Sequence, residues 1–307
     1  MKAYVRHGAG SSDHGPAGLV AAFSRDLLDA LDLDITAYDE EFVRQALTRN
    51  ARASKFRSTD TYGTYLVGNR AAAEAFCQAL RVSYSDFFRN PLAFALLEQQ
   101  VLPALFAKKK LTGCDEIRIW SVGCSTGQET WSVAMLVDDL TRAANPPQTC
   151  RIFASDLSEQ VLAVARAGTY SSAAVANVRH RHLDECFSRQ GEFHVIVPRL
   201  RALVDFSVYD LLDPSTSSPM ASIYGDFDLI LCCNLLYYYR PSIQHQILNK
   251  ICRALAPGGY CVTGETEQSI VARGHGLRAV IPTSSVFLMD TQPRINNLPP
   301  DPLTHNI

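Results

Sequence analysis

The chain has 307 residues, 47% of them hydrophobic, which is enough for one large domain or for a small and a large one. Its formal net charge of -2 gives no general attraction to nucleic acid or to an anionic membrane. The first residues hold no apolar core of signal-peptide length, and no apolar run approaches the roughly 18 residues that span a bilayer. We therefore expect a soluble protein of the cytoplasm that does not bind nucleic acid and is not inserted in a membrane.

The nine cysteines do not form the pattern of a disulfide framework or of a metal site. Their number is odd, and no Cys-x2-Cys pair occurs. Most of them stand in or beside apolar runs, where a free cysteine behaves as a small hydrophobic residue. We expect reduced thiols, as in the cytosol, and no bound metal.

The first third of the chain is predicted to be helical. Residues 1–18 are small and polar and are expected to form a mobile arm. From there to residue 111 the apolar residues recur at helical spacing, as Leu19, Phe23 and Leu27 do, and no strand-like alternation appears. We predict an all-helical N-terminal domain over residues 19–111.

The remainder of the chain alternates between strand-like and helix-like segments. Short apolar runs bounded by glycine or by polar residues indicate strands that are buried on both faces. The expected strands are 117–122, 151–155, 203–208, 227–233 and 260–263, and the expected helices are 128–140, 157–167 and 242–255. This alternation predicts an α/β domain over residues 112–291, with a mostly parallel sheet covered by helices on both faces.

Three further segments interrupt or end this pattern. Residues 191–197 and 201–206 are interpreted as a small β-hairpin inserted in the domain, and residues 279–281 and 286–289 as a terminal pair of strands. The last residues, 292–307, are rich in proline and asparagine and are expected to be disordered.

A small-residue loop follows the first predicted strand and leads into a helix. Glycine at positions 123 and 127 lets the backbone approach a ligand, and the start of the helix offers free N–H groups. The loop lies at the carboxyl end of a strand, where open α/β sheets bind their ligands. A plain strand-to-helix turn is the alternative.

An acidic residue, Asp156, stands at the end of the second predicted strand. A carboxylate there can accept both hydroxyls of a ribose, although it would also suit the N-cap of the following helix. The glycines do not have the Gly-x-Gly-x-x-Gly spacing, and Asp156 is more than about 20 residues beyond the loop, which argues against a nicotinamide cofactor. The absence of a lysine after the glycines excludes a P-loop.

The fourth predicted strand ends in Asn234 and a run of tyrosines at 237–239. An asparagine amide can bind the amino-acid end of a cofactor, and tyrosines can line a pocket with one polar tip each. Alternatively, the tyrosines pack a helix onto the sheet.

In this order the features resemble the class I methyltransferases, and their details resemble the CheR family, whose members methyl-esterify glutamates of chemoreceptors. The resemblance extends over residues 42–267. It implies a Rossmann-like domain that binds S-adenosylmethionine and releases S-adenosylhomocysteine. The positions matching the family's cofactor-binding residues are Ser83, Ser85, Arg89, Gly123, Cys124, Ser125, Glu129, Asp156, Leu157, Asp210, Leu211, Asn234 and Leu235.

The chain departs from the family pattern at several positions. Cys233 stands where the family usually has arginine, and Tyr239 where it has phenylalanine. The family's Glu-Glu-Pro-Tyr reads Gln-Glu-Thr-Trp at residues 128–131, and Ser83 and Ser85 replace the usual asparagine and threonine. These differences lie mainly on the acceptor side, so the resemblance implies the cofactor more strongly than the substrate.

The chemistry implied by the resemblance needs no general base, because a glutamate with an unperturbed pKa of about 4.3 is ionised at neutral pH. A group that holds this carboxylate is needed instead. We predict that Arg89 has this role, since a guanidinium binds carboxylates through two parallel hydrogen bonds. Alternatively, Arg89 holds the cofactor's own carboxylate or ties the two domains together. Tyr238 is expected to line the channel of methyl transfer.

Basic residues outnumber acidic ones between residues 41 and 70, and Arg44, Arg52 and Lys55 are spaced to share one side of a helix. Such a helix would suit docking on an acidic receptor, or it is simply a solvated face. The hairpin predicted near residues 191–206 would correspond to a small β-subdomain that grips a receptor tail in some family members.

Two other functions remain open at this point. One is an S-adenosylmethionine-dependent enzyme of specialised metabolism, which methylates a small acid or cyclises the aminobutyrate chain of the cofactor. The other is a non-catalytic sensor or adaptor, which the presence of Arg89 and Tyr238 disfavours.

Overall fold

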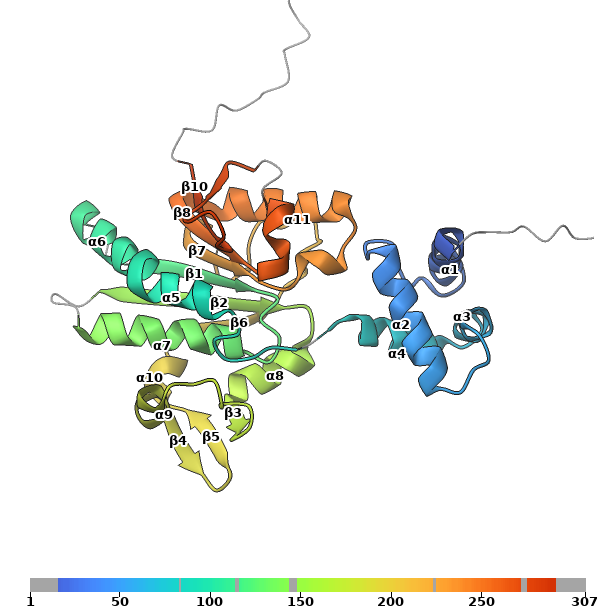
Figure 1. The fold of residues 1–307 in the computed structure, drawn as a ribbon, viewed down its shortest axis with the longest axis horizontal. Helices are drawn as coiled ribbons and strands as arrows, with labels where there is room; N and C mark the ends of the chain where they lie inside the picture. Colours follow the sequence, from blue (N-terminus) through green and yellow to red (C-terminus); the bar gives the residue numbers. More distant parts are fainter. Residues whose placement is uncertain are drawn as a thin grey trace, which may run out of the picture. The chain divides into compact units, whose positions relative to one another are not determined.

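The computed structural model describes residues 16–82, 84–113, 116–143, 148–222, 225–271 and 275–290. The chain divides into two compact units (Figure 1). The helical unit comprises residues 1–82 and 237–244, and the sheet unit comprises residues 83–236 and 245–307. Ser83, the predicted tail at 292–307 and most of the predicted N-terminal arm lie outside the described residues. No helix in the described part of the chain is long and apolar enough to cross a membrane.

In the described part of the helical unit, the N-terminal helices are α1 (Pro16–Leu31), α2 (Glu40–Ala53), α3 (Thr59–Val67) and α4 (Arg70–Leu80). Side chains of Asp39, Ser58 and Asn69 cap α2, α3 and α4 by accepting backbone N–H groups of the first turn. The helical periodicity predicted for this region is confirmed. Helix α1 begins at Pro16, a residue well suited to a first helical turn, so the predicted arm overlaps the helix by three residues.

The segment 237–244 joins the helical unit although it is remote in sequence. The backbone N–H of Asp39 donates to the carbonyl of Tyr238 at 2.8 Å, and that of Arg240 donates to the carbonyl of Ala37 at 3.1 Å. The rings of Tyr38 and Tyr239 stack with their centroids 5.4 Å apart. The tyrosine run therefore packs against the start of α2.

The sheet unit is built on seven strands in the order β6-β2-β1-β7-β8-β10-β9 (Figure 1). Their bounds are β1 Glu116–Val122, β2 Thr149–Asp156, β6 Val204–Val208, β7 Phe227–Cys232, β8 Leu255–Thr263, β9 Leu277–Ala279 and β10 Val286–Met289. The first five pair in parallel, and β10 runs antiparallel to both β8 and β9. The predicted α/β fold and the terminal strand pair are confirmed. Strand β1 lies between β2 and β7, where the order reverses and such sheets bind ligands.

Helices α5 (Pro91–Leu96), η1 (Leu97–Val101) and α6 (Leu102–Thr112) belong to the sheet unit, not to the helical domain expected from the sequence. Apolar side chains of α6 such as Leu105 share one core with Ile117 and Ile119 of β1. Lys109 also pairs with buried Asp228 at 2.9 Å. Periodicity predicts that a segment is helical, but it does not predict which core the helix joins.

Two further helices follow β1 and β2, namely α7 (Gln128–Ala143) and α8 (Glu159–Ala167). Trp131 of α7 joins the same core as Ile119, so α7 covers the same face as α6. The alternate residue Trp120 points to the opposite face, where its ring contacts Tyr209. Lys250 of α11 (Pro241–Ala254) lies over that tyrosine ring, so the opposite face is covered by α11.

A second, three-stranded antiparallel sheet has the order β3-β5-β4, from β3 (Thr169–Ser171), β4 (Phe187–Gln190) and β5 (Phe193–Ile196). The inserted β-hairpin thus exists as β4 and β5, but the predicted pairing of 191–197 with 201–206 is wrong. Residues 204–208 pair in parallel with β2 instead. Helix α10 (Pro198–Arg201) turns the chain between β5 and residues 204–208. The prediction failed because alternating hydrophobicity indicates a strand but not the strand with which it pairs.

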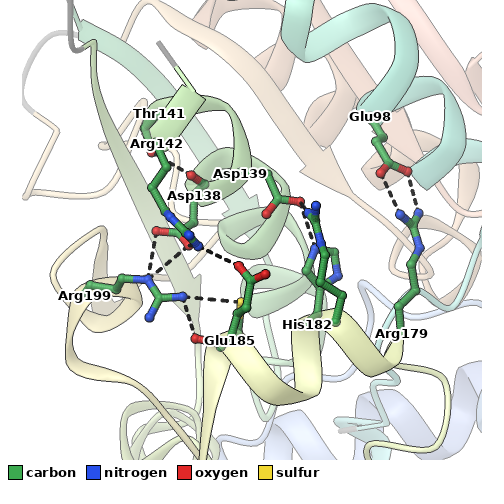
Figure 2. Close-up of polar contacts among 11 residues, drawn as sticks. Glu98, Asp138, Asp139, Thr141, Arg142, Arg179, His182, Glu185 and Arg199 are labelled. Carbon is green, nitrogen blue, oxygen red and sulfur yellow. Dashed lines mark hydrogen bonds and ion pairs between the residues drawn. The ribbon is translucent and has the colours of Figure 1, made fainter. Parts of the chain in front are cut away.

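A network of ion pairs and hydrogen bonds connects helix α7 to the two short helices that flank this small sheet in the sequence, α9 and α10 (Figure 2). Asp138 has a side chain that is 7% exposed, and both its oxygens accept Nε of Arg199, at 3.2 and 3.1 Å. Asp139 accepts Nε2 of buried His182, from α9 (His180–Cys186), at 2.9 Å. These contacts place two acidic residues of α7 against side chains of α9 and α10.

Replacing Asp138 with asparagine is expected to lower the melting temperature by about 4 °C, from a loss of about 1–2 kcal/mol of stability. The amide group would oppose the guanidinium of Arg199, which both oxygens of Asp138 now bind. Scanning calorimetry measures the shift. Asp184 is an exposed residue of α9, so Asp184→Asn is the matched control and should change nothing. Equal melting of both variants would show that the network does not stabilise the sheet unit.

Candidate functional site

A pocket lies at the carboxyl ends of β1, β7 and β8 within the sheet unit. The space between the lining residues is about 550 Å³ when the part open to solvent is included. The predicted site residues that line it are Ser85, Arg89, Gly123, Cys124, Ser125, Glu129 and Asn234.

The loop between β1 and α7 needs glycine at both predicted positions. Gly123 has φ +62°, and a Cβ there would lie 3.3 Å from Cδ1 of Leu235. Gly127 has φ +91°, and a Cβ there would lie 2.9 Å from the Cβ of Ala165. Ser125 also has a positive φ of 52°, which is costly for a residue with a side chain. Its neighbours must hold this strained backbone in place.

Asp156 holds the loop. Its Oδ2 accepts the N–H of Ser125 at 2.9 Å, and its Oδ1 accepts the N–H of Ser158 at 3.0 Å. Helix α8 begins at Glu159 with Ser158 at its N-cap, so the alternative reading of Asp156 as the N-cap is wrong. A carboxylate has about four acceptor positions, so two of those of Asp156 remain available to a ligand.

Ser125 provides a second indication of a ligand. Its hydroxyl Oγ is buried, lines the pocket, and has no hydrogen-bond partner among the described residues. A buried polar atom without a partner costs free energy comparable to a lost hydrogen bond. A ligand atom in the pocket would satisfy it.

Glu129, in the first turn of α7, contributes a half-buried carboxylate. Burial raises the pKa of Glu129 to about 7, and the nearby charge of Glu267 acts in the same direction. Hydrogen bonds from the Cys233 thiol and the Ser121 hydroxyl oppose this shift, as does the charge of Arg89. The site therefore favours a ligand that brings a positive charge to Glu129.

Asn234, the second residue after β7, adopts φ 57°. Buried Glu267, at the end of the short helix η3 (Glu265–Glu267), holds this conformation by accepting three backbone N–H groups. They belong to Asn234 at 2.9 Å, Leu236 at 2.7 Å and Gly264 at 2.8 Å. The role of Glu267 was not predicted from the sequence. The one local signal for a site residue here is Gly264, which follows β8 three residues earlier.

Arg89 reaches the pocket from the segment that precedes α5. Its Cζ lies 5.2 Å from the centroid of the Tyr84 ring, a cation–π contact. The hydroxyl of Tyr84 donates to Oδ2 of Asp86 at 2.5 Å. Phe88 has φ 51°, and its N–H donates to Oγ of Ser132 at 3.0 Å. Tyr84 and Asp86, which also line the pocket, were not predicted from the sequence.

A family model described as "CheR methyltransferase, SAM binding domain" matches residues 83–276. This chain belongs to the CheR methyltransferase family. A chemotaxis protein methyltransferase of Listeria monocytogenes is 27% identical over 255 residues, covering 83% of this chain and 92% of that protein. Chemotaxis protein methyltransferase 1 of Pseudomonas aeruginosa is 33% identical over 198 residues, covering 63% and 69%. A chemotaxis protein methyltransferase of Escherichia coli is 30% identical over 236 residues, covering 75% and 77%.

The protein is accordingly an S-adenosylmethionine-dependent methyltransferase of Rossmann-like fold, and the residues present suit this CheR-family cofactor. The free acceptor positions of Asp156 suit ribose hydroxyls. The Glu129 carboxylate suits an ammonium group, and the unpaired Ser125 hydroxyl suits a further polar atom. Among the described residues, no three histidine, cysteine or acidic side chains gather as a metal site would need.

Several predicted positions lie outside the pocket wall. Leu157, Asp210 and Leu211 follow β2 and β6, two strands that pair side by side. Leu157 is 42% exposed, and Oδ1 of Asp210 accepts the N–H of Leu212. The side chain of Leu235 lies against Gly123.

Tyr238 belongs to the helical unit, at the end of the short helix η2 (Leu236–Tyr238). Its hydroxyl bonds that of Tyr237 at 2.8 Å, and its ring lies 4.9 Å from that of Phe42. Its place in a methyl-transfer channel stays a prediction.

Proposed function

We propose that this enzyme transfers the methyl group of S-adenosylmethionine to glutamate side chains of a chemotaxis receptor, forming methyl esters in the cytoplasm. The observation that carries the proposal is Arg89, a guanidinium on the wall of the cofactor pocket. Relatives named chemotaxis protein methyltransferase support the same substrate class.

The cofactor supplies a methyl group that its sulfonium already activates, so this chain has to bind and align. Asp156 would hold the ribose, Glu129 the α-ammonium, and Asn234 the amino-acid end. A substrate glutamate is ionised at neutral pH and needs no base. Arg89 would hold that carboxylate through its two-pronged donor geometry.

Arg89→Lys is expected to lower kcat/KM for the acceptor about tenfold and to leave cofactor affinity within about twofold, because lysine keeps the charge but loses the paired donors. Initial rates at varied acceptor and binding titrations of S-adenosylhomocysteine separate the two effects. Arg81 is exposed and outside the pocket, so Arg81→Lys is the control. If the variant lost only cofactor affinity, Arg89 would bind the cofactor and not the acceptor.

The proposed receptor contact is the exposed basic side of α2 and the turn after it. Arg44 pairs with Glu41, with Nε and Oε2 at 2.7 Å. Arg49, Arg52, Lys55 and Arg57 are exposed, and no ion pair involves them within the described residues. Val43 and Leu47, on the other side of α2, are buried in the helical core. Helix α2 therefore presents a basic side to solvent and an apolar side to the core, and the basic side suits an acidic helical partner.

The proposal is tested by incubating the enzyme with S-adenosylmethionine labelled in the methyl group and with receptor cytoplasmic fragments. Methyl esters release methanol in base, so the expected result is label on the receptor that becomes volatile at high pH. Receptor without label, accompanied by conversion of the cofactor to another small product, would overturn the proposal in favour of a metabolic enzyme.

A further inference from the structure

The guanidinium of Arg89 lies on the pocket wall with its hydrogen-bond donors unused by the protein. Within the described part of the chain, Arg89 takes part in no hydrogen bond and no ion pair, and its Cζ lies 5.2 Å from the centroid of the Tyr84 ring. A guanidinium carries five N–H donors and no acceptor. These donors are therefore free for a ligand that offers oxygen atoms.

The backbone on both sides of Arg89 is held by contacts to distant parts of the sheet unit. The N–H of Phe88, which has φ 51°, donates to Oγ of Ser132 at 3.0 Å. The amide Nδ2 of Asn90 donates to Oγ of Ser285 at 2.8 Å. These contacts fix where the side chain of Arg89 begins. They do not fix where its guanidinium ends, because a long arginine side chain keeps much rotational freedom.

Tyr84 supplies that support from the start of the same segment. It is 62% exposed, so packing in a core does not hold its ring. Its hydroxyl donates to Oδ2 of half-buried Asp86 at 2.5 Å, a short hydrogen bond to a charged acceptor. Asp86 thus fixes the hydroxyl end of the ring, and Arg89 lies over the ring.

The same hydrogen bond occupies a carboxylate that could neutralise Arg89. Asp86 stands three residues before Arg89 in the sequence. The structure describes both residues, and they form no ion pair with each other, because Asp86 accepts the Tyr84 hydroxyl instead. A cation–π contact uses the face of a guanidinium, whereas a carboxylate binds along its edge. Tyr84 therefore orients Arg89 without occupying the donors that a carboxylate needs.

We propose that Tyr84, anchored by Asp86, positions the guanidinium of Arg89 for the carboxylate of the acceptor glutamate. The inference rests on the acceptor role given to Arg89 above. Methyl transfer requires that carboxylate to lie in line with the methyl–sulfur bond, so an arginine of variable direction aligns it less often. Tyr84 is then a positioning residue that acts on the acceptor through Arg89 and leaves cofactor binding unchanged.

The first test replaces Tyr84 with leucine, which removes the ring but keeps an apolar side chain. The expected result is a fall of about fivefold in kcat/KM for receptor cytoplasmic fragments, the effect of losing one exposed cation–π contact. The affinity for S-adenosylhomocysteine should stay within about twofold. Initial rates at varied acceptor and calorimetric titrations measure the two quantities. Tyr65 is an exposed tyrosine of α3 outside the pocket, so Tyr65→Leu is the matched control and should retain the wild-type rate.

Tyr84→Phe tests whether the ring itself gives the support. Phenylalanine keeps a ring beneath Arg89, so this variant should retain at least about half of the wild-type kcat/KM. A phenylalanine variant as slow as the leucine variant would overturn the proposal. A leucine variant that lost cofactor affinity by the same factor as kcat/KM would also overturn it, because Tyr84 would then belong to the cofactor site.

A double-mutant cycle shows whether Tyr84 acts through Arg89. In Arg89→Gln no cation remains over the ring, so the further change Tyr84→Leu should alter kcat/KM by less than about 1.5-fold. A purely structural role of Tyr84 would give the same fivefold loss in both backgrounds, and that result would contradict the proposal.

The failure of this inference differs from the failure of the proposed function. A wild-type enzyme that left receptor glutamates unmodified would overturn both. A wild-type enzyme that methylated them, with a Tyr84→Leu variant of equal kcat/KM, would overturn the positioning role of Tyr84 alone.

Discussion

Asp156→Asn is expected to weaken S-adenosylhomocysteine binding about 100-fold. The Asp156 carboxylate has two tasks, because it accepts the N–H of Ser125 and keeps acceptor positions for ribose hydroxyls. Each charge-assisted hydrogen bond contributes about 1.5–3 kcal/mol, and an amide can supply one oxygen only. A total loss of about 3 kcal/mol corresponds to about 100-fold in affinity.

Calorimetric titration measures this loss, and Asp205→Asn is its control. Asp205 lies on the neighbouring strand β6 and makes an exposed ion pair with Arg151, at 2.7 Å. Such surface pairs contribute little, so the control should bind like the wild type. If Asp156→Asn bound within threefold of the wild type, the ribose would have to be held elsewhere.

Glu129→Gln is expected to weaken cofactor binding about 30-fold and, at the same time, to stabilise the fold. The pKa of Glu129 is raised from 4.5 to about 7 in the folded enzyme. A carboxyl group with a raised folded pKa binds more protons in the folded than in the unfolded state between those two values. Ionising Glu129 therefore costs stability as pH rises from about 4.5 to 7, and the full cost is present above pH 7.

Glutamine removes that cost, and partial exposure of the site reduces the gain to about 1–2 kcal/mol. We expect the variant to melt about 4 °C higher than the wild type at about pH 8, with the difference vanishing near about pH 4.5. Calorimetric scans at both pH values measure this. Glu192→Gln, at an exposed turn, is the control. A variant that is less stable at about pH 8 would show that Glu129 is not a strained, functional carboxylate.

The sequence predicted the sheet well because its parallel strands are short apolar runs, each ended by a polar or glycine residue. The loop at Gly123 and the acid at Asp156 follow from the same logic, since the carboxyl ends of adjacent parallel strands meet at one edge. The positive φ of Gly123, and the hydrogen bond that Asp156 accepts from the N–H of Ser125, then explain why those residue types stand there.

The features that were not predicted from the sequence depend on which segments pair or pack with one another in the folded chain. The strand at 204–208 alternates like a hairpin strand, yet it pairs with β2. Helix α6 has the periodicity of the preceding helices, yet its apolar side packs on β1. Glu267 reaches the site because η3 folds back after β8. No local sequence pattern predicts the hydrogen bonds that it accepts from the backbone of Asn234 and Leu236.

The most direct measurement of the central claim is mass spectrometry of receptor cytoplasmic fragments after incubation with the enzyme and S-adenosylmethionine. We expect a base-labile gain of one methyl group on individual glutamate residues, lost when the modified glutamate is replaced by glutamine and reduced with the Arg89→Lys enzyme. Unmodified receptor glutamates, with the methyl group or the aminobutyrate chain of the cofactor found in a small molecule, would contradict the account.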